Sequence, residues 1–589
     1  MRGWDRWPGR RRLAVAAVLA LAACGSTAPP RPAVAVSASP TASAQPRPIA
    51  ATPVPPVPAP PPAPRPPSQQ QPVPVAPAIA PALAARFPEP VVSFATPAFE
   101  AGRSAFTTNA ELRAILHGLE RSGADPAHGT GVSVLPLGTS QSGEPIEALA
   151  FTRPAAPAPA ASAASAPAPA PASRPAVVLV AGQHGDEPAG TEALVVIAQD
   201  LAAGALDRVL DQLDVYLLPR ANPDGAALGQ RGAADGSDVN RDHLLLRTPE
   251  AQAEAQLVRD VAPIVVLDLH EYAVDAGFAA KFGGVQRYDV LLQAATVANL
   301  PPFVGRAGEE WFRAPLAASL AAAGFSNGWY YTLAADPADR KISMGGVAAS
   351  IGRNANGLRN AVSLLVETRG RGIGRGDLKR RVQAAVTATR SVLGYAAAHA
   401  ADLVKLRQFV DRDVAALACQ GEAVIEAAPT PSEHALAMLD PITGAIKRVT
   451  VAWDSALELR VVKSRPRPCG YWLAASESDA VQRLRLLGVE VQQLDEAGEV
   501  RGETYRETGR DALAAPDAAA RLRVQTLPVL LDVAAGSYFV SLEQPLANLA
   551  IAALEPESPV GFAANGVIGS VAQEARVLAW PQMRMAGVP

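Results

Sequence analysis

The feature that most constrains the fold is an apolar run that stops at a glycine and is followed at once by an imidazole and a carboxylate. Residues 177–180 form the apolar run, and His184 and Glu187 stand three residues apart just beyond it. A second run, residues 264–269, ends on His270. Apolar runs without polar alternation are typical of strands buried on both faces. The two runs therefore predict buried strands whose ends present these three side chains at the rim of a sheet.

Two imidazoles and one carboxylate at strand ends match a zinc site with three protein ligands. Such a site keeps its fourth position open for water. The alternatives are an ordinary loop position for His184, a position at the edge of the core for His270, and a helix-capping role for Glu187, since carboxylates favour helix N-termini. We favour the zinc site because all three residues follow the same structural pattern.

The order of apolar segments predicts the fold class. From about residue 90 to residue 400, strand-like runs alternate with helix-like segments such as residues 188–201 and 248–261, and Thr248 is the expected N-cap of the second helix. This alternation predicts an α/β fold with a mixed, largely parallel central sheet flanked by helices. Sites in such sheets lie at the carboxyl ends of the strands. The expected strands are residues 132–137, 146–151, 176–180, 213–218, 264–269 and 363–366.

Composition divides the 589 residues into four expected parts. Residues 1–24 are a signal peptide, and residues 25–88 are a disordered Pro/Ala-rich tether that cannot form a packed core. Residues 89–404 form the domain that holds the candidate ligands. Its Ala/Pro insertion, residues 155–175, is expected to be an expanded hairpin loop, because loop insertions cost little closure entropy. Residues 405–589 show recurring short β-like runs and no catalytic motif, and they are expected to form a β-rich accessory region.

The first residues have the pattern of a bacterial secretory signal. Three arginines at residues 10–12 precede an apolar stretch at residues 13–20, and Cys24 follows directly. This end resembles the lipobox of bacterial lipoproteins, which implies lipidation of Cys24 and attachment to a membrane. The alternative is an ordinary cleaved signal in which Cys24 has no role. In both cases we expect an exported, periplasmic protein.

The remaining cysteines and the charge add limits on partners. Cys419 and Cys469 could form one disulfide in an oxidising periplasm or remain as two thiols, and the sequence leaves both possibilities open. The formal net charge of -3 is close to neutral. Without a basic tract, we expect no nucleic-acid partner.

Five ordered elements resemble the zinc carboxypeptidase family, of which carboxypeptidase A is the type. The resemblance covers roughly residues 130–375. The elements are His184-Gly185-Asp186-Glu187, Asn222-Pro223-Asp224-Gly225, Asp238-Val239-Asn240-Arg241, Leu267-Asp268-Leu269-His270 and Leu364-Leu365-Val366-Glu367. The resemblance implies one Zn²⁺ per chain, held by the three candidate ligands. That ion would lower the pKa of a bound water and polarise the scissile carbonyl. Asp268 could support His270, although we expect strand alternation to point it away.

The resemblance also implies roles for four further residues. Glu367 would be the general base, and Arg231 would stabilise the oxyanion. Asn240 and Arg241 would bind the terminal carboxylate of the substrate. The alternatives are structural ones: an ion pair of Glu367 with a nearby arginine, a surface position for Arg231, a turn position for Asn240, and an ion pair of Arg241 with a neighbouring aspartate.

The chain departs from the family pattern at one tyrosine. The family supplies a tyrosine in the loop before the catalytic glutamate, but residues 340–354 contain none. Tyr330 and Tyr331 lie upstream, at a spacing that does not support replacement. Arg353 in this loop indicates an acidic substrate group, such as glutamate or the free carboxylate of diaminopimelate. A structural ion pair is the alternative for Arg353.

The leading hypothesis is a zinc-dependent metallocarboxypeptidase that hydrolyses an amide next to a free carboxylate, on peptides or peptidoglycan fragments. A first alternative keeps the zinc but makes the chain a deacylase of N-acyl amino acids, similar to desuccinylases. A second alternative is a catalytically inactive, envelope-binding lipoprotein. A serine hydrolase is not expected, because the chain has no Gly-x-Ser-x-Gly element.

Overall fold

The computed structural model describes residues 80–123, 129–153, 174–274, 276–334, 336, 338–512 and 520–588, all within one compact unit. The expected signal peptide, Cys24, most of the tether and most of the Ala/Pro insertion lie outside the described residues. Within the described part, no helix is both long enough and apolar enough to cross a bilayer. The folded part begins before residue 89, because Leu83 and Phe87 are buried against Leu439.

An eight-stranded mixed sheet forms the centre of the fold, in the order β1-β2-β4-β3-β5-β11-β7-β8. Its strands are β1 (Gly131–Thr139), β2 (Pro145–Thr152), β3 (Ala176–Ala181), β4 (Asp214–Leu218), β5 (Val265–Ala273), β7 (Val290–Ala294), β8 (Asn327–Trp329) and β11 (Val362–Arg371). The four inner strands β4, β3, β5 and β11 are parallel to one another. Antiparallel pairs join β1 to β2, β2 to β4 and β7 to β11. The predicted α/β class, with a mixed and largely parallel sheet, is confirmed.

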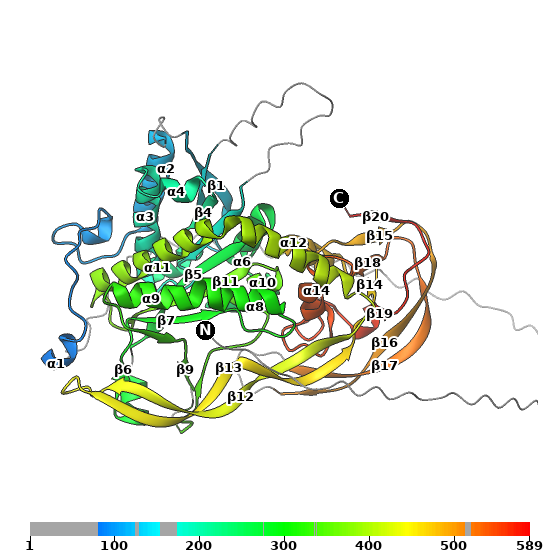
Figure 1. Cartoon of the computed structure of the whole chain (residues 1–589). Helices are drawn as coiled ribbons and strands as arrows, with labels where there is room; N and C mark the ends of the chain where they lie inside the picture. The colour runs from blue at the N-terminus through cyan, green and yellow to red at the C-terminus, as the bar shows by residue number, and fades with distance from the viewer. Residues whose placement is uncertain are drawn as a thin grey trace, which may run out of the picture. The chain divides into compact units, whose positions relative to one another are not determined.

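Helices cover both faces of this sheet. The α-helices of the described residues, including those of the C-terminal region, are α1 (Pro81–Ala84), α2 (Asn109–Ser122), α3 (Pro188–Ala202), α4 (Asp207–Leu210), α5 (Pro223–Leu228), α6 (Pro249–Val261), α7 (Ala276–Phe282), α8 (Pro302–Ala307), α9 (Ala314–Ala322), α10 (Gly352–Leu358), α11 (Leu378–Ala398), α12 (Ala400–Ala416), α13 (Ser478–Leu486) and α14 (Ala547–Leu554). Val177 and Leu179 share one apolar cluster with α3 and α11, whereas Val178 and Val180 share another with α6. Figure 1 shows α11 and α9 crossing over β5, β11 and β7. Burial on both faces explains why these strands are apolar without alternation.

The expected helix starts are found in the structure. Thr248 accepts a hydrogen bond at its hydroxyl from the backbone N–H of Ala251, 3.2 Å away, so it caps α6 as predicted. Pro188 occupies the first turn of α3, where a missing N–H costs nothing. Helix α3 follows the loop that carries His184 and Glu187, and α6 follows the segment that carries Asn240 and Arg241, so the two helix starts fix where those loops end.

The β-rich C-terminal region begins with a long hairpin that reaches back to the part of the chain that holds the candidate ligands, residues 80–404, which is called the catalytic part below. Its strands pair with short strands of the preceding region in a five-stranded sheet, in the order β6-β12-β13-β10-β9. These strands are β6 (Val285–Gln286), β9 (Thr332–Leu333), β10 (Ile342–Ser343), β12 (Glu422–Leu439) and β13 (Ile446–Pro466). Because β10 belongs to the loop that precedes Glu367, the hairpin helps to position that loop.

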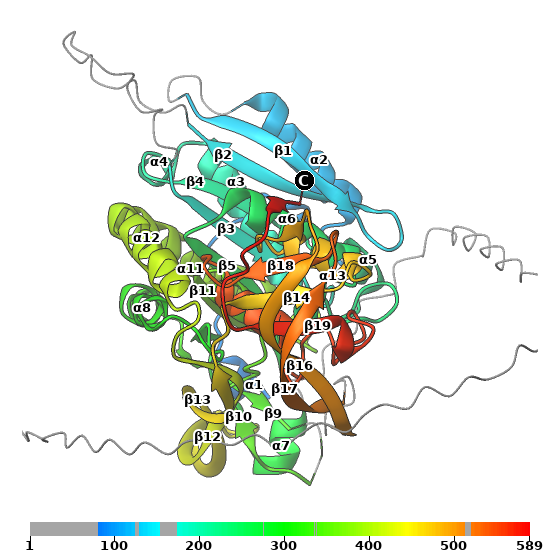
Figure 2. The same cartoon turned by 90° about the vertical axis from the view of Figure 1, so that its right-hand side faces the viewer.

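A seven-stranded sheet, in the order β17-β16-β19-β14-β18-β15-β20, completes the chain. Figure 2 shows β14, β16, β18 and β19 of this sheet. Its strands are β14 (Gly470–Leu473), β15 (Gln492–Leu494), β16 (Gly498–Asp511), β17 (Arg521–Val533), β18 (Tyr538–Ser541), β19 (Glu574–Val577) and β20 (Met585–Gly587). Tyr471 and Leu554 of this region share one apolar core with Val239, Leu244 and Leu358 of the catalytic part. The two regions are therefore packed together through a common core.

A disulfide joins Cys419, just after α12, to Cys469, just before β14. The sequence left this pairing open, and the structure pairs the two residues. The bond spans a sequence separation of 50 residues that includes the whole β12–β13 hairpin. It therefore connects the catalytic part directly to the first strand of the seven-stranded sheet.

We expect replacement of both Cys419 and Cys469 by serine to lower the melting temperature. Closing a loop of about 50 residues restricts the unfolded chain by up to about 4 kcal/mol of free energy. Calorimetry of the double variant, and of the wild type with and without a reductant, measures the shift. Two reactive thiols in the native, unreduced protein, with no shift in melting temperature, would contradict this expectation.

Candidate metal centre and active site

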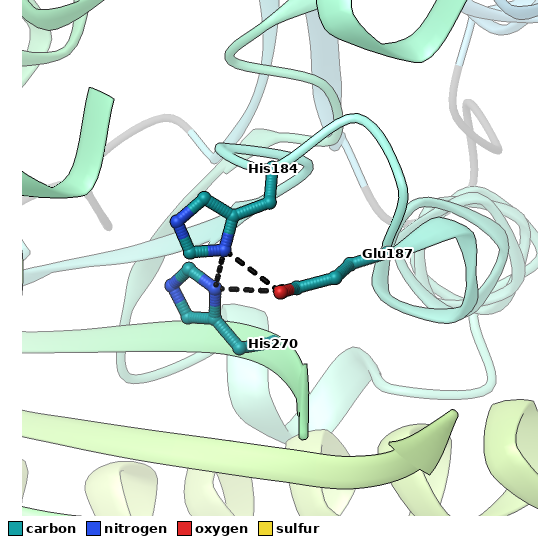
Figure 3. Close-up of side chains that lie close together, drawn as sticks. All are labelled: His184, Glu187 and His270. Atoms are coloured by element: carbon teal, nitrogen blue, oxygen red, sulfur yellow. Dashed lines mark hydrogen bonds and ion pairs between the residues drawn. The ribbon is translucent and has the colours of Figure 1, made fainter. Parts of the chain in front are cut away.

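His184, Glu187 and His270 meet at the carboxyl ends of two adjacent parallel strands. The chain leaves β3 through Gly182, whose positive φ of 65° and close approach to the Arg220 backbone favour glycine. The Nδ1 atoms of His184 and His270 each lie 2.9 Å from a different carboxylate oxygen of Glu187. The two Nδ1 atoms are 3.1 Å apart, so all three donor groups point at one small space (Figure 3).

The three side chains fit a zinc ion. One ligand atom from each lies within 4.8 Å of the others, and all three residues are buried. Two imidazole nitrogens and one carboxylate are the donor set that catalytic zinc sites use. Glu187 stands at the N-cap position of α3 but makes no side-chain capping bond. The capping alternative for this residue is therefore not what the structure shows.

Electrostatics keep Glu187 ionised. Burial alone would raise the pKa of Glu187, but the neighbouring His184 and His270 hold this pKa well below its ordinary value. The backbone N–H of Glu271 donates to Oε2 of Glu187 over 2.9 Å, which fixes the carboxylate. An ionised carboxylate that is already oriented suits a metal ligand.

The Asn-Pro-Asp-Gly element supports the loop that carries His184. Asn222 donates from Nδ2 to the carbonyl of Gln183, and its Oδ1 accepts from the backbone N–H of Gly225. A Cβ on Gly185 would come within 1.8 Å of the Gly225 carbonyl carbon. The absence of a side chain at Gly185 therefore allows the ligand loop to pack against the backbone of this turn.

A buried polar network holds the far side of the His270 ring. Oδ1 of Asp268 lies 2.9 Å from Nε2 of His270 and also accepts from Nε2 of Gln183 over 2.8 Å. The expectation that Asp268 points away from His270 was wrong, because residues two positions apart on a strand lie on the same face. His243 extends the network, with Nε2 2.8 Å from Oε1 of Gln183. Such partners fix the orientation of a ligating ring.

Arg231 lies at the ligands and is held there by Asp238. Its Nη2 and Nε donate to Oδ2 of Asp238 over 2.9 and 3.1 Å, and its Nη1 lies 3.1 Å from Nδ1 of His184. The other oxygen of Asp238 lies 3.2 Å from Nε2 of His184. Asp238 thus joins a ligand to the predicted oxyanion-binding group. From the sequence, Asp238 was considered only as an ion-pair partner of Arg241, although its place two residues before Asn240 in the motif was a signal for a role in the site.

Glu367 lies on β11 directly beside His270, because the parallel register of β11 and β5 pairs these two residues. Burial and the nearby Glu187 carboxylate raise the pKa of Glu367 to about 7. The neighbouring Arg369 pairs with Asp377 over 2.8 Å. Among the described residues, no cation lies within ion-pair distance of the Glu367 carboxylate. The alternative of an ion pair between Glu367 and a nearby arginine is therefore not formed among the described residues.

The expected carboxylate-binding pair is split between two environments. Asn240 is buried, with Oδ1 accepting from the backbone N–H of Gly352 over 2.8 Å and Nδ2 3.0 Å from Nε2 of His270. Arg241 is exposed and donates to the carbonyl of Asn240. In the described part of the chain, no carboxylate lies within 4.0 Å of the Arg241 guanidinium nitrogens. Arg241 is thus the member of the pair that is available to a ligand.

These side chains surround one cavity of about 840 Å³. The wall includes the metal ligands His184 and Glu187 together with Arg231, Arg241, Arg353, Glu367, Tyr330 and Tyr331. The C-terminal region contributes Pro559, Val560 and Asn565, and Arg247 donates to the carbonyl of Asn565 over 2.7 Å. The part that residues 559–565 take in the cavity wall could not be predicted from the sequence, because no motif marks these residues.

A tyrosine is present in the cavity although the loop before Glu367 has none. Tyr330 follows β8, and its ring lies against the loop so closely that a Cβ on Gly345 would come within 2.6 Å of Cε1. Burial and the nearby Glu367 raise the pKa of Tyr330. The edge strand β8 thus brings to the cavity a residue whose spacing in the sequence gave no such indication.

The fold and the site define a metallohydrolase centre, with three buried ligands for one metal ion and a carboxylate beside them. Residues 125–273 match the family model described as zinc carboxypeptidase. Carboxypeptidase 2 of Trichophyton rubrum is 29% identical over 403 residues, which cover 67% of this chain and 74% of that protein. Human carboxypeptidase D is 46% identical over 72 residues, which cover 11% of this chain and 5% of that protein.

Among solved structures, a metallo-carboxypeptidase from Pseudomonas aeruginosa is 21% identical and covers 50% of this chain and 68% of that chain, with a TM-score of 0.34. The family match confirms the predicted resemblance and the expected zinc cofactor. Residues 125–273, which include the three candidate ligands, are thus similar to the zinc carboxypeptidases, and the chain is a metallopeptidase hydrolase.

We expect the purified protein to hold one zinc ion per chain and His270→Ala to hold far less, because the variant removes one of three protein ligands. Elemental analysis after dialysis measures the zinc content. His434→Ala, an exposed histidine on β12, is the matched control and should retain the wild-type content. An unchanged zinc content in His270→Ala would show that the metal is held elsewhere.

Proposed function

We propose that this protein is an exopeptidase that removes single residues from the carboxyl end of peptides. The observation that carries the proposal is the position of Glu367, an unpaired buried carboxylate on the strand next to His270, facing the same cavity as the ligands. Zinc, when bound, would supply Lewis acidity and an acidified water. The remaining chemistry comes from side chains of this chain.

Each step assigned to the protein follows from its geometry. Glu367 accepts a proton from the attacking water at its carboxylate and returns it to the nitrogen of the leaving amine. A pKa of about 7 allows both transfers near neutral pH. Arg231, oriented by Asp238, donates to the oxyanion that develops on the scissile carbonyl. Arg241 binds the α-carboxylate of the last residue.

The size of the cavity supports the proposal that the substrates are small. A volume of about 840 Å³ lies within the range of pockets that bind small molecules. Pro559, Val560 and Asn565 of the C-terminal region border this space, and β13 of the hairpin pairs with β10 in the loop before Glu367. We therefore propose short peptides, including peptide fragments of peptidoglycan, as the substrates.

We also propose that the protein acts outside the cytoplasm, in the periplasm, attached to a membrane through lipidated Cys24. The support is the signal-like pattern of residues 1–24 and the Cys419–Cys469 disulfide, since disulfides persist mainly in oxidising compartments. Peptides released from the cell envelope would be accessible to an enzyme in that place.

Glu367→Gln should reduce turnover by about 10²- to 10⁴-fold, the range that a general base contributes, while the zinc content stays at the wild-type value. Steady-state kinetics on a short peptide, together with elemental analysis, measures both quantities. Glu310→Gln, an exposed carboxylate on the helical segment before α9, is the control. Wild-type turnover in Glu367→Gln would remove Glu367 from the mechanism and favour a protein that only binds.

Mass spectrometry of products should show loss of single C-terminal residues when the full-length protein, solubilised in detergent, is incubated with mixed peptides and muropeptides. A chelator should abolish the reaction, and added zinc should restore it. If small acyl groups were released from N-acyl amino acids while peptides stayed intact, the deacylase alternative would replace the proposal. If neither class reacted at any zinc loading, the binding alternative would replace it.

A further inference from the structure

Arg353 is a buried cation that makes no ion pair within the described part of the chain. It lies on α10 and is 4% exposed. Its Nη2 donates to the carbonyl of Gly346 over 2.7 Å, but its Nε has no hydrogen-bond partner. Among the described residues, no carboxylate lies within 4.0 Å of its guanidinium nitrogens. The structural ion pair that the sequence left open for Arg353 is therefore not formed.

Three other buried arginines of the catalytic part are paired with carboxylates, whereas Arg220 and Arg359 are buried without an ion pair among the described residues but do not line the cavity. Arg380 pairs with Asp289 over 2.6 Å, Arg381 with Glu271 over 2.7 Å, and Arg369 with Asp377 over 2.8 Å. Burial of an unpaired charge is destabilising, so a cation of this kind is expected either to be paired or to serve a ligand. Arg353 differs from these three because it faces the cavity.

The surroundings of Arg353 define a small compartment of the active-site cavity. Its guanidinium carbon lies 5.8 Å from the centre of the Tyr330 ring. Gly345, Gly346 and Ala348 of the loop before Arg353 line the cavity beside it, and Glu367 lines the same cavity.

The cavity presents two arginines that lack carboxylate partners among the described residues, Arg241 at its exposed side and Arg353 at its buried side. A single α-carboxylate has enough acceptor sites to contact both guanidinium groups, whereas a residue with two carboxylates gives each arginine a partner of its own. Guanidinium groups bind carboxylates with two parallel hydrogen bonds, which gives specificity for charge and shape.

We propose that Arg353 selects substrates whose C-terminal residue carries a second carboxylate, as glutamate, aspartate and diamino-dicarboxylic acids do. This inference rests on the proposed exopeptidase function and assigns its substrate class. The α-carboxylate binds Arg241, and the side-chain carboxylate enters the compartment beside Tyr330 and binds Arg353. Burial lowers the pKa of Arg353, but an arginine stays protonated across the working pH range.

The test compares peptides that are identical except for the last residue: glutamate, glutamine, leucine or lysine. Glutamate and glutamine have nearly the same shape, so their ratio of kcat/KM isolates the charge. The wild type should prefer glutamate by about 10- to 100-fold, which is the range expected for a charge-assisted hydrogen bond in a buried site. Free glutamate should likewise inhibit more strongly than free glutamine.

Arg353→Met should remove this preference by lowering kcat/KM for the glutamate peptide and leaving the glutamine and leucine peptides within a few-fold of the wild type. Arg353→Lys keeps the charge and should retain part of the preference. Arg306→Met, an exposed arginine on α8, is the control and should change nothing. Circular dichroism and zinc content show whether each variant is folded.

Three outcomes would overturn the inference. In the first, the wild type cleaves the leucine or glutamine peptide as fast as the glutamate peptide, so the exopeptidase function stands and the acidic selectivity fails. In the second, Arg353→Met lowers kcat/KM equally for all four peptides, which assigns Arg353 to binding of the α-carboxylate instead. In the third, no peptide is cleaved at all, and the proposed function fails with it. If the variants did not fold, the wild-type glutamate-to-glutamine ratio and the inhibition by the free amino acids would still decide.

Discussion

The parallel register of β3, β5 and β11 is the constraint on which the active site depends. It places the end of β3 beside the end of β5, and Glu367 of β11 directly beside His270. Because the chain runs in the same direction in all three strands, polar side chains distant in the sequence emerge at one edge. A shift of one residue in β11 would turn Glu367 to the opposite face, where α3 and α11 pack. The apolar side chains of both faces therefore fix the catalytic geometry as well as the core.

Charge then separates the two carboxylates of the site into different roles. Glu187 lies between two histidines and is held ionised despite burial, whereas Glu367 lacks a paired cation and its pKa is raised to about 7. Under the proposed function, these unlike environments suit one carboxyl group to be a ligand and the other to be a base. Asp238 connects two other groups of the site. One of its oxygens accepts from Arg231, and the other lies close to His184.

The sequence predicted what local pattern determines and missed what tertiary contact determines. Continuous apolar runs give the inner strands, and the residues that end them give the ligands, so His184, Glu187 and His270 could be placed without a structure. Tyr330 could not, because it reaches the cavity through the edge strand β8. The role of residues 559–565 was also hidden, since their approach depends on the core shared by both regions. The orientation of Asp268 was available in principle, because the alternation rule gives it when applied correctly.

The C-terminal region is best understood as part of the active site rather than as an appendage. Its hairpin strand β13 pairs with β10 in the loop that carries Gly345 and Arg353, and its residues 559–565 line the same cavity. The Cys419–Cys469 disulfide joins the two ends of the segment that contains the β12–β13 hairpin. The ligands lie after β3 and on β5, whereas the loop before Glu367 is also held by β13 of the C-terminal region. The substrate cavity therefore depends on contacts from both regions, and the core that they share joins these contacts to the segment around Asn240.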